Sequence, residues 1–351
     1  MRLSDLSGHI SGWFDGSGRT ADIVISSRIR LARNLANFEF LPCLSPQRQK
    51  QVLAKLKEAI LSLALGDDTT FLDIEDVSSL ERDLLVERHL ISKRHASGKG
   101  ARGVVIAAKE SFTAMINEED HLRIQVFSAG LDLYECWRRI NDIDDALEKK
   151  VKYAFSPKYG YLTACPTNLG TGIRVSVMLH LPGLKMTGQI EKFFNAARDM
   201  GLAVRGLFGE GTEAVGDFFQ LSNQITLGIC ETEIVEEFSK TIVPKIADYE
   251  TIARGELLNK RKEALDDKIH RALGVLKTAR LISSQEALFL LSQVRMGVNL
   301  GRVEGISIAT VNELFMLTQP AHLQFNSGSE LSPNDRDIMR AQIIRSRLYQ
   351  N

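Results

Sequence analysis

The chain has 351 residues, of which 44% are hydrophobic and 25% charged, a composition typical of a globular protein with room for two domains. Lysine plus arginine and aspartate plus glutamate both number 44, so the composition argues against a broad basic surface for nucleic acid. No apolar run approaches the roughly 20 residues that cross a bilayer, and the first residues lack a secretory leader pattern. We therefore expect a cytoplasmic protein with no membrane and no nucleic-acid partner.

The four cysteines are widely spaced and form no CxxC pair, so the sequence predicts neither a disulfide framework nor a zinc site. Cys43, Cys136 and Cys230 are interpreted as small buried residues of a reducing compartment. Cys165 differs because a motif rich in proline, asparagine and glycine surrounds it.

Segments with alternating apolar residues dominate the chain before Glu231 and are predicted as strands. In chain order they are 23–31, 103–107, 123–127, 161–165, 173–181, 202–207 and 218–227. Helical spacing predicts helices over 45–65, 130–150 and 189–200. Ser45 before Pro46 is typical of a helix start.

The basic, glycine-rich stretch 92–102 predicts a mobile loop, either a solvated surface turn or a flap near an anionic ligand. From Glu231 onward the strand pattern ends, and apolar residues recur at helical spacing. We therefore predict an α+β region over 1–254 and a smaller all-α domain over 255–351. The boundary is expected inside or just after a long helix.

Arginines stand on four of the predicted strands: Arg28 and Arg30, then Arg123, Arg174 and Arg205. The first two share a strand face, because alternate residues of a strand point the same way. A single strand arginine is usually a solvated surface residue. If these strands belong to one sheet, however, five guanidinium groups would converge on one surface. Converging cations require a polyanion between them, and a nucleoside triphosphate carries such a charge.

The common nucleotide-binding motifs are absent: there is no GxxxxGK[ST] loop, no GxGxxG after a strand, and no HRD or DFG motif. An ATP site in this chain would therefore hold the phosphates with arginine side chains. Acidic clusters at 117–120 and 209–213 stand directly beside Arg123 and Arg205. Acidic clusters in turns are usually solvent-exposed residues without a specific role. Exposure to solvent alone, however, does not explain why both clusters lie beside candidate phosphate-binding arginines.

Five motifs, in order, resemble those of the phosphagen kinases, the ATP:guanidino phosphotransferases. They are SSRIR at 26–30, NEEDHLR at 117–123, CPTNLGT at 165–171, RGLFGEGTE at 205–213 and LSN at 221–223. The resemblance covers roughly residues 22–254 and implies that family's fold, a largely antiparallel sheet flanked by helices. Residues 214–220 depart from the small-molecule kinases, which show a second glycine and an aspartate there.

The resemblance implies ATP as the phosphoryl donor, with Mg²⁺ held mainly through ATP and no metal site in the protein itself. The implied ATP-binding residues are Ser26, Ser27, Arg28, Ile29, Arg30, His89, Arg123, Arg174, Val175, Ser176, Val177, Met178, Arg205, Gly206, Leu207, Phe208, Gly209 and Glu210. The assignment of His89 rests on the resemblance alone.

Glu119 and Glu210 would be the carboxylates that grip the substrate guanidinium, with Cys165 near the substrate nitrogen. A guanidinium is cationic and a poor nucleophile, because its pKa lies above about 12. Two carboxylates can hold it bidentately, aim one nitrogen at the γ-phosphorus and accept the proton. Direct in-line transfer needs no phosphocysteine.

In small-molecule members of the family an all-helical domain precedes the first ATP-binding strand. Here that strand begins near residue 23, and an all-α segment follows the catalytic region instead. This architecture resembles the bacterial protein-arginine kinases and implies arginine side chains of proteins as substrates, marked for quality control or degradation. It also implies an activator protein and an AAA+ protease as partners. The amphipathic C-terminal helices suggest a homodimer.

The tail sequence RDIMRA resembles an allosteric phosphoarginine pocket of that branch, and its implied residues are Arg336, Asp337, Arg340 and Ala341. The two arginines at i and i+4 share a helix face and could clamp a phosphate. Two alternatives stay open. The first is a small-molecule arginine kinase, which free-arginine turnover would reveal. The second is an inactive phosphoarginine-binding adaptor, which the intact site residues oppose. A nucleic-acid-binding module is rejected, because the net charge is neutral and an aromatic stacking pattern is absent.

Overall fold

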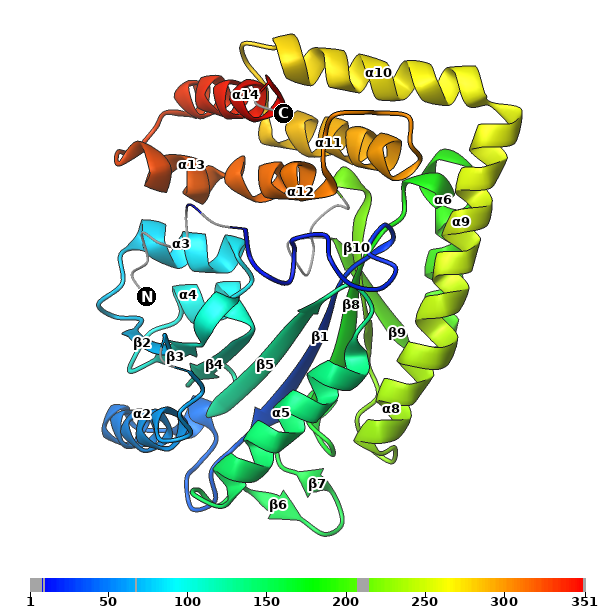
Figure 1. Ribbon diagram of the computed structural model, residues 1–351. Coiled ribbons are helices and arrows are strands. Elements are labelled where there is room, and N and C mark those ends of the chain that lie inside the picture. Colours follow the sequence, from blue (N-terminus) through cyan, green and yellow to red (C-terminus); the bar gives the residue numbers. More distant parts are fainter. Residues whose placement is uncertain (1–7, 9, 67, 207–214, 350–351) are drawn as a thin grey trace.

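The computed structural model describes residues 8, 10–66, 68–206 and 215–349, and an eight-stranded antiparallel sheet lies at its centre (Figure 1). The strand order is β2-β3-β4-β5-β1-β8-β10-β9. The strands are β1 (Val24–Arg33), β2 (Thr70–Asp73), β3 (Gly103–Ile106), β4 (Phe112–Ile116), β5 (Leu122–Ala129), β8 (Ile173–His180), β9 (Leu202–Gly206) and β10 (Phe218–Asn223). A separate two-stranded hairpin consists of β6 (Phe155–Ser156) and β7 (Gly160–Tyr161).

Helices flank the sheet and then form an all-α region at one end of it (Figure 1). The first group is α2 (Pro46–Leu61), α3 (Ser79–Glu87), α4 (Lys93–Ser97), α5 (Leu133–Glu148), α6 (Pro182–Met186), α7 (Ile190–Asp199), α8 (Glu231–Glu237) and α9 (Val243–Lys260). The C-terminal helices are α10 (Lys262–Thr278), α11 (Ser284–Asn299), α12 (Ile308–Leu317), α13 (Pro320–Ser327) and α14 (Pro333–Tyr349). The predicted fold class, α+β followed by an all-α region, is confirmed.

The two faces of the central strands differ in chemistry because side chains alternate along a strand. Ile29, Val175 and Val177 point into the main apolar core, which also contains residues of α2, α5 and α8. The opposite face carries the arginines. β1 pairs with β8 so that Arg28 lies opposite Ser176 and Arg30 opposite Arg174. Register and parity together gather these side chains on one surface.

The arginine-bearing face is covered at one end by a second apolar core. Phe127, Met178 and Phe218 come from three strands and pack with Trp13, Phe14 and the helices α10, α11, α12 and α14. Phe127 shares its strand face with Arg123, and Met178 shares its face with Arg174. The C-terminal helices therefore pack on the same sheet face that carries the arginines, so they are adjacent to any site on it.

Several predicted elements are confirmed at shifted bounds. Helix α2 begins after Ser45, whose hydroxyl accepts a hydrogen bond from the Arg48 amide as an N-cap. The strand predicted over 161–165 is wrong beyond Tyr161, because residues 162–165 form a turn that leads into the short 3-10 helix Pro166–Asn168. Strands β2 and β4 were not predicted.

The stretch 92–102 is not an open loop, since α4 occupies Lys93–Ser97 and Ser92 caps it by accepting from the His95 amide. Within the stretch, the buried His95 ring contacts the Gly103 carbonyl. The prediction of a loop was wrong for a local reason. The serine N-cap stabilises this single helical turn despite the glycines close to it in the sequence.

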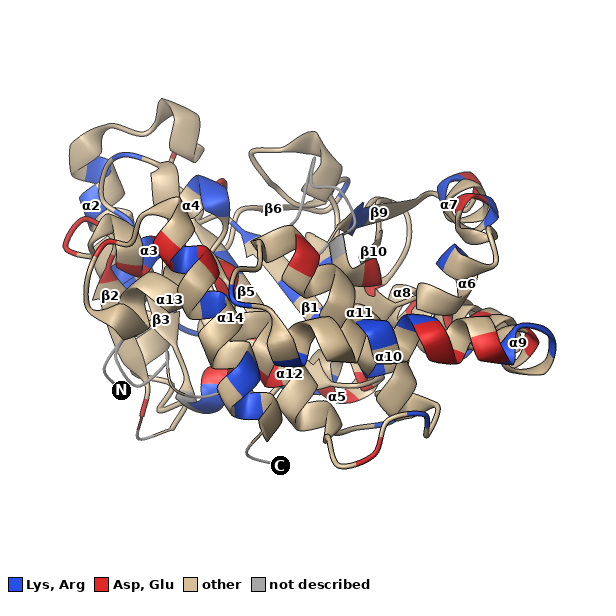
Figure 2. Cartoon of the chain, turned by 90° about the horizontal axis from the view of Figure 1, so that it is seen from above, with Lys and Arg blue, Asp and Glu red and all other residues tan. Residues whose placement is uncertain are grey.

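All four cysteines are free. Cys136 is buried as expected, but Cys43 and Cys230 are exposed, so the burial expected for those two is wrong. Within the described ranges, no helix is both long and apolar enough to cross a membrane. Figure 2 shows both charge signs along α9, in keeping with the balanced composition.

The predicted boundary near residue 254 falls inside the long helix α9. Ala253 belongs to the main core, whereas Leu257, one turn later, belongs to the second core. The boundary itself stays a prediction.

Candidate functional site

Five arginines from four strands line one cavity of about 480 Å³ on the polar face of the sheet. They are Arg28, Arg30, Arg123, Arg174 and Arg205, the same five that the sequence singled out. The same cavity is lined by His89, Glu119 and Cys165. The structure thus brings together side chains that lie up to 177 positions apart in the sequence (Arg205 minus Arg28).

The arginine side chains repel one another inside this cavity. Burial, followed by the charges of Arg123, Arg174 and Arg205, lowers the pKa of Arg28 to about 9. Burial, Arg174 and Arg205 likewise lower the pKa of Arg123 to about 9. Both groups remain cationic at neutral pH, so a bound polyanion would relieve their repulsion. The electrostatics therefore favour a phosphate-rich ligand.

Neighbouring polar groups hold some of these guanidinium groups in place. Arg28 Nε donates to Ser176 Oγ at 3.1 Å, and Arg174 Nη1 donates to the Asn223 carbonyl at 2.9 Å. Arg30 Nε and Arg123 Nε, in contrast, are buried without a hydrogen-bond acceptor among the described residues. Buried donors of this kind are normally satisfied by a ligand or by water.

The acidic turn before β5 gives each of its carboxylates a different partner. Glu118 Oε2 pairs with Arg123 at 2.8 Å, and Glu119 Oε1 pairs with the exposed Arg94 of α4 at 3.1 Å. Asp120 Oδ1 accepts from the Ala164 amide at 2.7 Å, directly before Cys165. Burial raises the pKa of both Glu118 and Asp120. Glu119 is therefore the carboxylate of this turn that pairs with a solvent-exposed side chain.

Cys165 lies at the start of the 3-10 turn, with its Sγ 3.0 Å from Thr167 Oγ1. Thr226 fixes the segment after it, because its hydroxyl donates to the Leu169 carbonyl at 2.7 Å. The cysteine is half-buried and lines the cavity. This places a polarizable sulfur in the same cavity as Glu119.

His89 enters the cavity from the turn that follows α3. Its backbone has a φ of 60°, in the left-handed region that is costly for a residue other than glycine. Burial and the nearby Arg28 lower the pKa of His89 to about 4, so the ring is neutral near pH 7. It lies edge-on to Trp13, with the ring centroids 5.4 Å apart. A neutral ring beside an aromatic suits an uncharged, planar ligand group.

Several of the other predicted ATP-binding residues do not present side chains to the cavity. Ile29, Val175 and Val177 point into the core on the opposite sheet face. Ser27 donates to the Gly130 carbonyl and accepts from the Asp132 amide. Ser26, Ser176 and Met178 are buried in strands, and Gly206 ends β9. Leu207, Phe208, Gly209 and Glu210 lie outside the described residues.

The predicted phosphoarginine residues lie on the first turns of α14. Arg340 is buried and donates to the carbonyls of Thr318 and Ile282, and it pairs with Asp337 at 2.5 Å. Arg336 and Asp337 are half-buried, whereas Ala341 is in the second core. Arg340 thus joins α14 to α12, and Arg336 is the more accessible cation of the pair.

Some lining residues were missed from the sequence. Gln125 lies two residues after Arg123, so strand parity could have placed it on the same face. Gln220 also lines the cavity and pairs with Arg205 on the neighbouring strand. Lys93 and Arg94 also line the cavity, which agrees with the flap interpretation of that stretch. Trp13, which contacts His89 from outside the cavity lining, gave no local signal in the sequence. In the described part of the chain, no three His, Cys, Asp or Glu side chains are grouped to hold a metal ion.

Comparison with known proteins connects this geometry to a family. Residues 51–253 match the family described as ATP:guanido phosphotransferase, C-terminal catalytic domain, and residues 262–351 match the family described as Protein-arginine kinase McsB C-terminal domain. The chain is 46% identical over 341 residues to the protein-arginine kinase of Symbiobacterium thermophilum, covering 96% of each chain. It is 44% identical to that of Bacillus pumilus, covering 97% of this chain and 93% of the relative.

Solved structures of small-guanidine kinases share the fold. The duplicated taurocyamine kinase from Schistosoma mansoni, solved with bound transition-state-analogue components, superposes with a TM-score of 0.61 at 26% identity. The match covers 77% of this chain and 39% of that one. A lombricine kinase superposes with a TM-score of 0.58 at 28% identity, covering 71% and 70%. The chain belongs to the ATP:guanido phosphotransferase family, in its protein-arginine kinase branch.

Proposed function

We propose that this phosphotransferase moves the γ-phosphoryl group of ATP to arginine side chains of proteins. The observation that carries the proposal is the convergence of five arginines, Glu119 and Cys165 on one cavity. The polyanion that those arginines require and the cationic guanidinium that Glu119 would hold are the two reactants of this transfer. The relatives that match nearly the whole chain bear the name protein-arginine kinase.

In the proposed site the arginines hold the ATP phosphates and His89 contacts the adenosine part. Mg²⁺ would be carried on ATP oxygens and water, where it neutralises phosphate charge. The remaining ATP-binding positions are proposed from the family motifs. Strand residues whose side chains face the core would contact ATP through their backbone groups. The division of the chain near residue 254 into catalytic and C-terminal domains belongs to the same proposal.

The chemistry needs a guanidinium held in line with the γ-phosphorus. Glu119 and Glu210 would grip the substrate guanidinium, and Cys165 would lie against the attacking nitrogen. That nitrogen forms a bond to phosphorus as the bond to the β,γ-bridging oxygen breaks, and ADP leaves. The proton of the attacking nitrogen passes to one of the carboxylates. Arginine side chains stabilise the charge on the transferring group.

The test is incubation with ATP, Mg²⁺ and an unstructured arginine-rich protein, alongside a reaction with free arginine. Phosphosites are mapped without acid, because N–P bonds are acid-labile. We expect phosphoarginine on the protein and none on free arginine. Turnover of free arginine alone would identify a small-molecule kinase. Transfer to neither, with ATP still bound, would contradict the proposal unless an activator protein restores it.

We also propose that Arg336, Asp337, Arg340 and Ala341 form a phosphoarginine pocket that regulates the kinase. Because Arg340 also holds α14 to α12, the sharper test changes Arg336 and Asp337. The double substitution Arg336→Ala, Asp337→Ala should reduce activation by added phosphoarginine at least about fivefold and leave basal activity unchanged. A dose-response with phosphoarginine measures this, and unaltered activation would remove the pocket from the account.

The proposed partners follow from the same branch of the family. A homodimer, an activator protein and an AAA+ protease that receives the marked substrates are proposed on that basis. Sedimentation of the purified chain would test the dimer, and a single sedimenting monomer would contradict it.

A further inference from the structure

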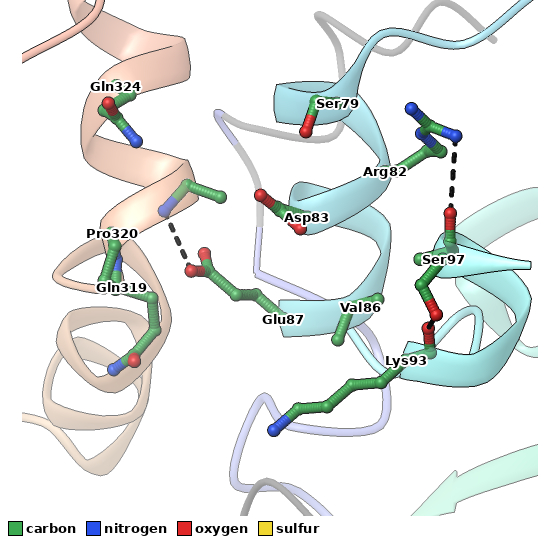
Figure 3. Close-up of a pocket in the computed structure, with 12 residues that line it drawn as sticks. Ser79, Arg82, Asp83, Val86, Glu87, Lys93, Ser97, Gln319, Pro320 and Gln324 are labelled. Atoms are coloured by element: carbon green, nitrogen blue, oxygen red, sulfur yellow. Dashed lines mark hydrogen bonds between the residues drawn. The ribbon is translucent and has the colours of Figure 1, made fainter.

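The C-terminal helices reach the nucleotide site through the end of α3, beside a cavity of about 730 Å³ between α3, α4 and α13. Figure 3 shows the Glu87 side chain crossing from α3 to the start of α13. His89, two residues further on, lines the arginine cavity. The contacts of Glu87 and Arg88 therefore lie directly before the residue proposed to contact adenosine.

Glu87 acts as a cap for α13 from another part of the chain. Its Oε1 accepts from the Ala321 amide at 2.8 Å, and its Oε2 accepts from the His322 amide at 3.1 Å. The α13 N-cap residue, Gln319, makes no side-chain capping bond of its own. First-turn amides need such acceptors, so Glu87 is fixed to the start of α13.

His322 links Glu87 to Arg88. Its Nδ1 lies 2.8 Å from Glu87 Oε2, and its Nε2 lies 3.3 Å from Arg88 Nη1. A carboxylate can only accept and a guanidinium can only donate, so the ring must donate at Nδ1 and accept at Nε2. That is one neutral tautomer, held from both sides in a fully buried position.

Arg88 is held on its other side by Glu110 and by Ser11 near the N-terminus. Its Nε donates to Glu110 Oε1 at 2.6 Å, and Nη2 donates to Ser11 Oγ at 3.1 Å. Arg88 and Glu110 are both almost completely buried. A buried ion pair of this kind has little freedom, because moving either charge leaves the other unpaired.

The turn that these contacts hold is strained. His89 has a positive φ, and its carbonyl accepts from Gln125 Nε2 at 3.0 Å. Non-glycine residues keep such a conformation only where the surroundings enforce it. The flanking Glu87 and Arg88, clamped to His322, are well placed to enforce it.

We propose that His322 and Glu87 are positioning residues through which the C-terminal helices set the place of His89 in the nucleotide pocket. This inference rests on the proposed function, because it assumes that ATP occupies the arginine cavity. Loss of the His322 side chain removes the bridge between Glu87 and Arg88, and although the α13 amides still donate to Glu87, the strained turn relaxes. ATP then binds more weakly, while groups at the transferring phosphoryl keep their places.

The main test is His322→Leu in the full-length protein. We expect the KM for ATP and the Kd for ATP by calorimetry to rise about tenfold, with kcat within about twofold of wild type. His322→Gln should recover most of the affinity, because its amide offers a donor and an acceptor on one planar group. The matched control is Arg295→Gln, which removes another buried contact of the C-terminal helices, with the Ala21 and Asp22 carbonyls.

A second readout does not depend on activity. Trp13 and Trp137 are the only tryptophans, so a Trp137→Phe background leaves Trp13 to report on the His89 ring beside it. His322→Leu should change the Trp13 emission without nucleotide, and Arg295→Gln should not. Unchanged ATP affinity and emission in His322→Leu would overturn the inference, as would an equal effect of Arg295→Gln. No phosphoryl transfer by the wild type would instead refute the proposed function.

Discussion

Replacing Glu119 by glutamine will lower kcat for arginine phosphorylation by about a thousandfold and leave ATP affinity within about twofold of wild type. Glutamine keeps the size of the side chain and can still accept from Arg94. It lacks the charge that holds a guanidinium, and it cannot take up the proton from the attacking nitrogen. ATP affinity should be spared, because in the proposed site the phosphates are held by the arginines that line the cavity.

Steady-state kinetics with an arginine peptide and calorimetry with ATP will measure the two effects. Glu39→Gln is the matched control, since Glu39 also pairs with an arginine, Arg48, at 3.0 Å but lies outside the cavity. A kcat within tenfold of wild type in Glu119→Gln would remove Glu119 from its assigned role. Glu210→Ala, at a position outside the described residues, should show a loss of similar size.

Arg28→Met should leave the melting temperature of the nucleotide-free protein unchanged or higher and abolish most of its stabilisation by ATP. Methionine fills the same stem volume and removes one of several mutually repelling cations. The higher stability without nucleotide and the weaker stabilisation by ATP have the same cause, the charge of Arg28. That charge destabilises the nucleotide-free fold and stabilises the complex with ATP. ATP affinity should fall about 10- to 100-fold, the cost of losing hydrogen bonds to a charged group.

The pH dependence has a definite sign. The folded pKa of Arg28 is about 9, below its ordinary value of 12.5, so the folded state disfavours the cation. The resulting loss of folding stability is therefore fully present below pH 9 and decreases as the pH rises toward 12.5. At neutral pH the difference in stability between wild type and Arg28→Met therefore measures the full destabilisation by this charge.

Thermal melts with and without ATP provide the measurement. Wild type should gain about 2.7 kcal/mol at an ATP concentration one hundred times its Kd. Arg138→Met is the control, because Arg138 is an exposed arginine on α5. A marked loss of stability in nucleotide-free Arg28→Met, or an ATP-induced shift equal to wild type, would contradict the account of the cluster.

Strand parity was enough to select the arginine-bearing surface from the sequence. Arg28 and Arg30 had to share a face with each other and oppose Ile29, whatever the rest of the fold, because the period of a strand is two. The family resemblance, and not parity, pointed to Glu119 and Cys165 through the motifs at 117–123 and 165–171, and both residues line the same cavity as the arginines.

Parity and the family resemblance gave different results for Ile29 and Val175. The resemblance assigned both to the ATP site, whereas parity put their side chains on the face opposite the arginines, and in the structure they lie in the core. The burial expected for Cys43 and Cys230 was wrong for another reason, because average preferences for cysteine say little about one loop position. The helix at Lys93–Ser97 escaped prediction because glycines flank a single helical turn.

The sequence by itself determined the fold class, the five arginines and the family, because these depend on periodicity and on ordered local motifs. Only the tertiary structure decided that Trp13 contacts His89 and that Glu87 contacts His322, since residues 76 and 235 positions apart carry no shared local pattern. Contacts of that kind depend on how the C-terminal helices pack on the arginine-bearing face of the sheet. Packing is cooperative and non-local, and for that reason no segment of the sequence encodes it alone.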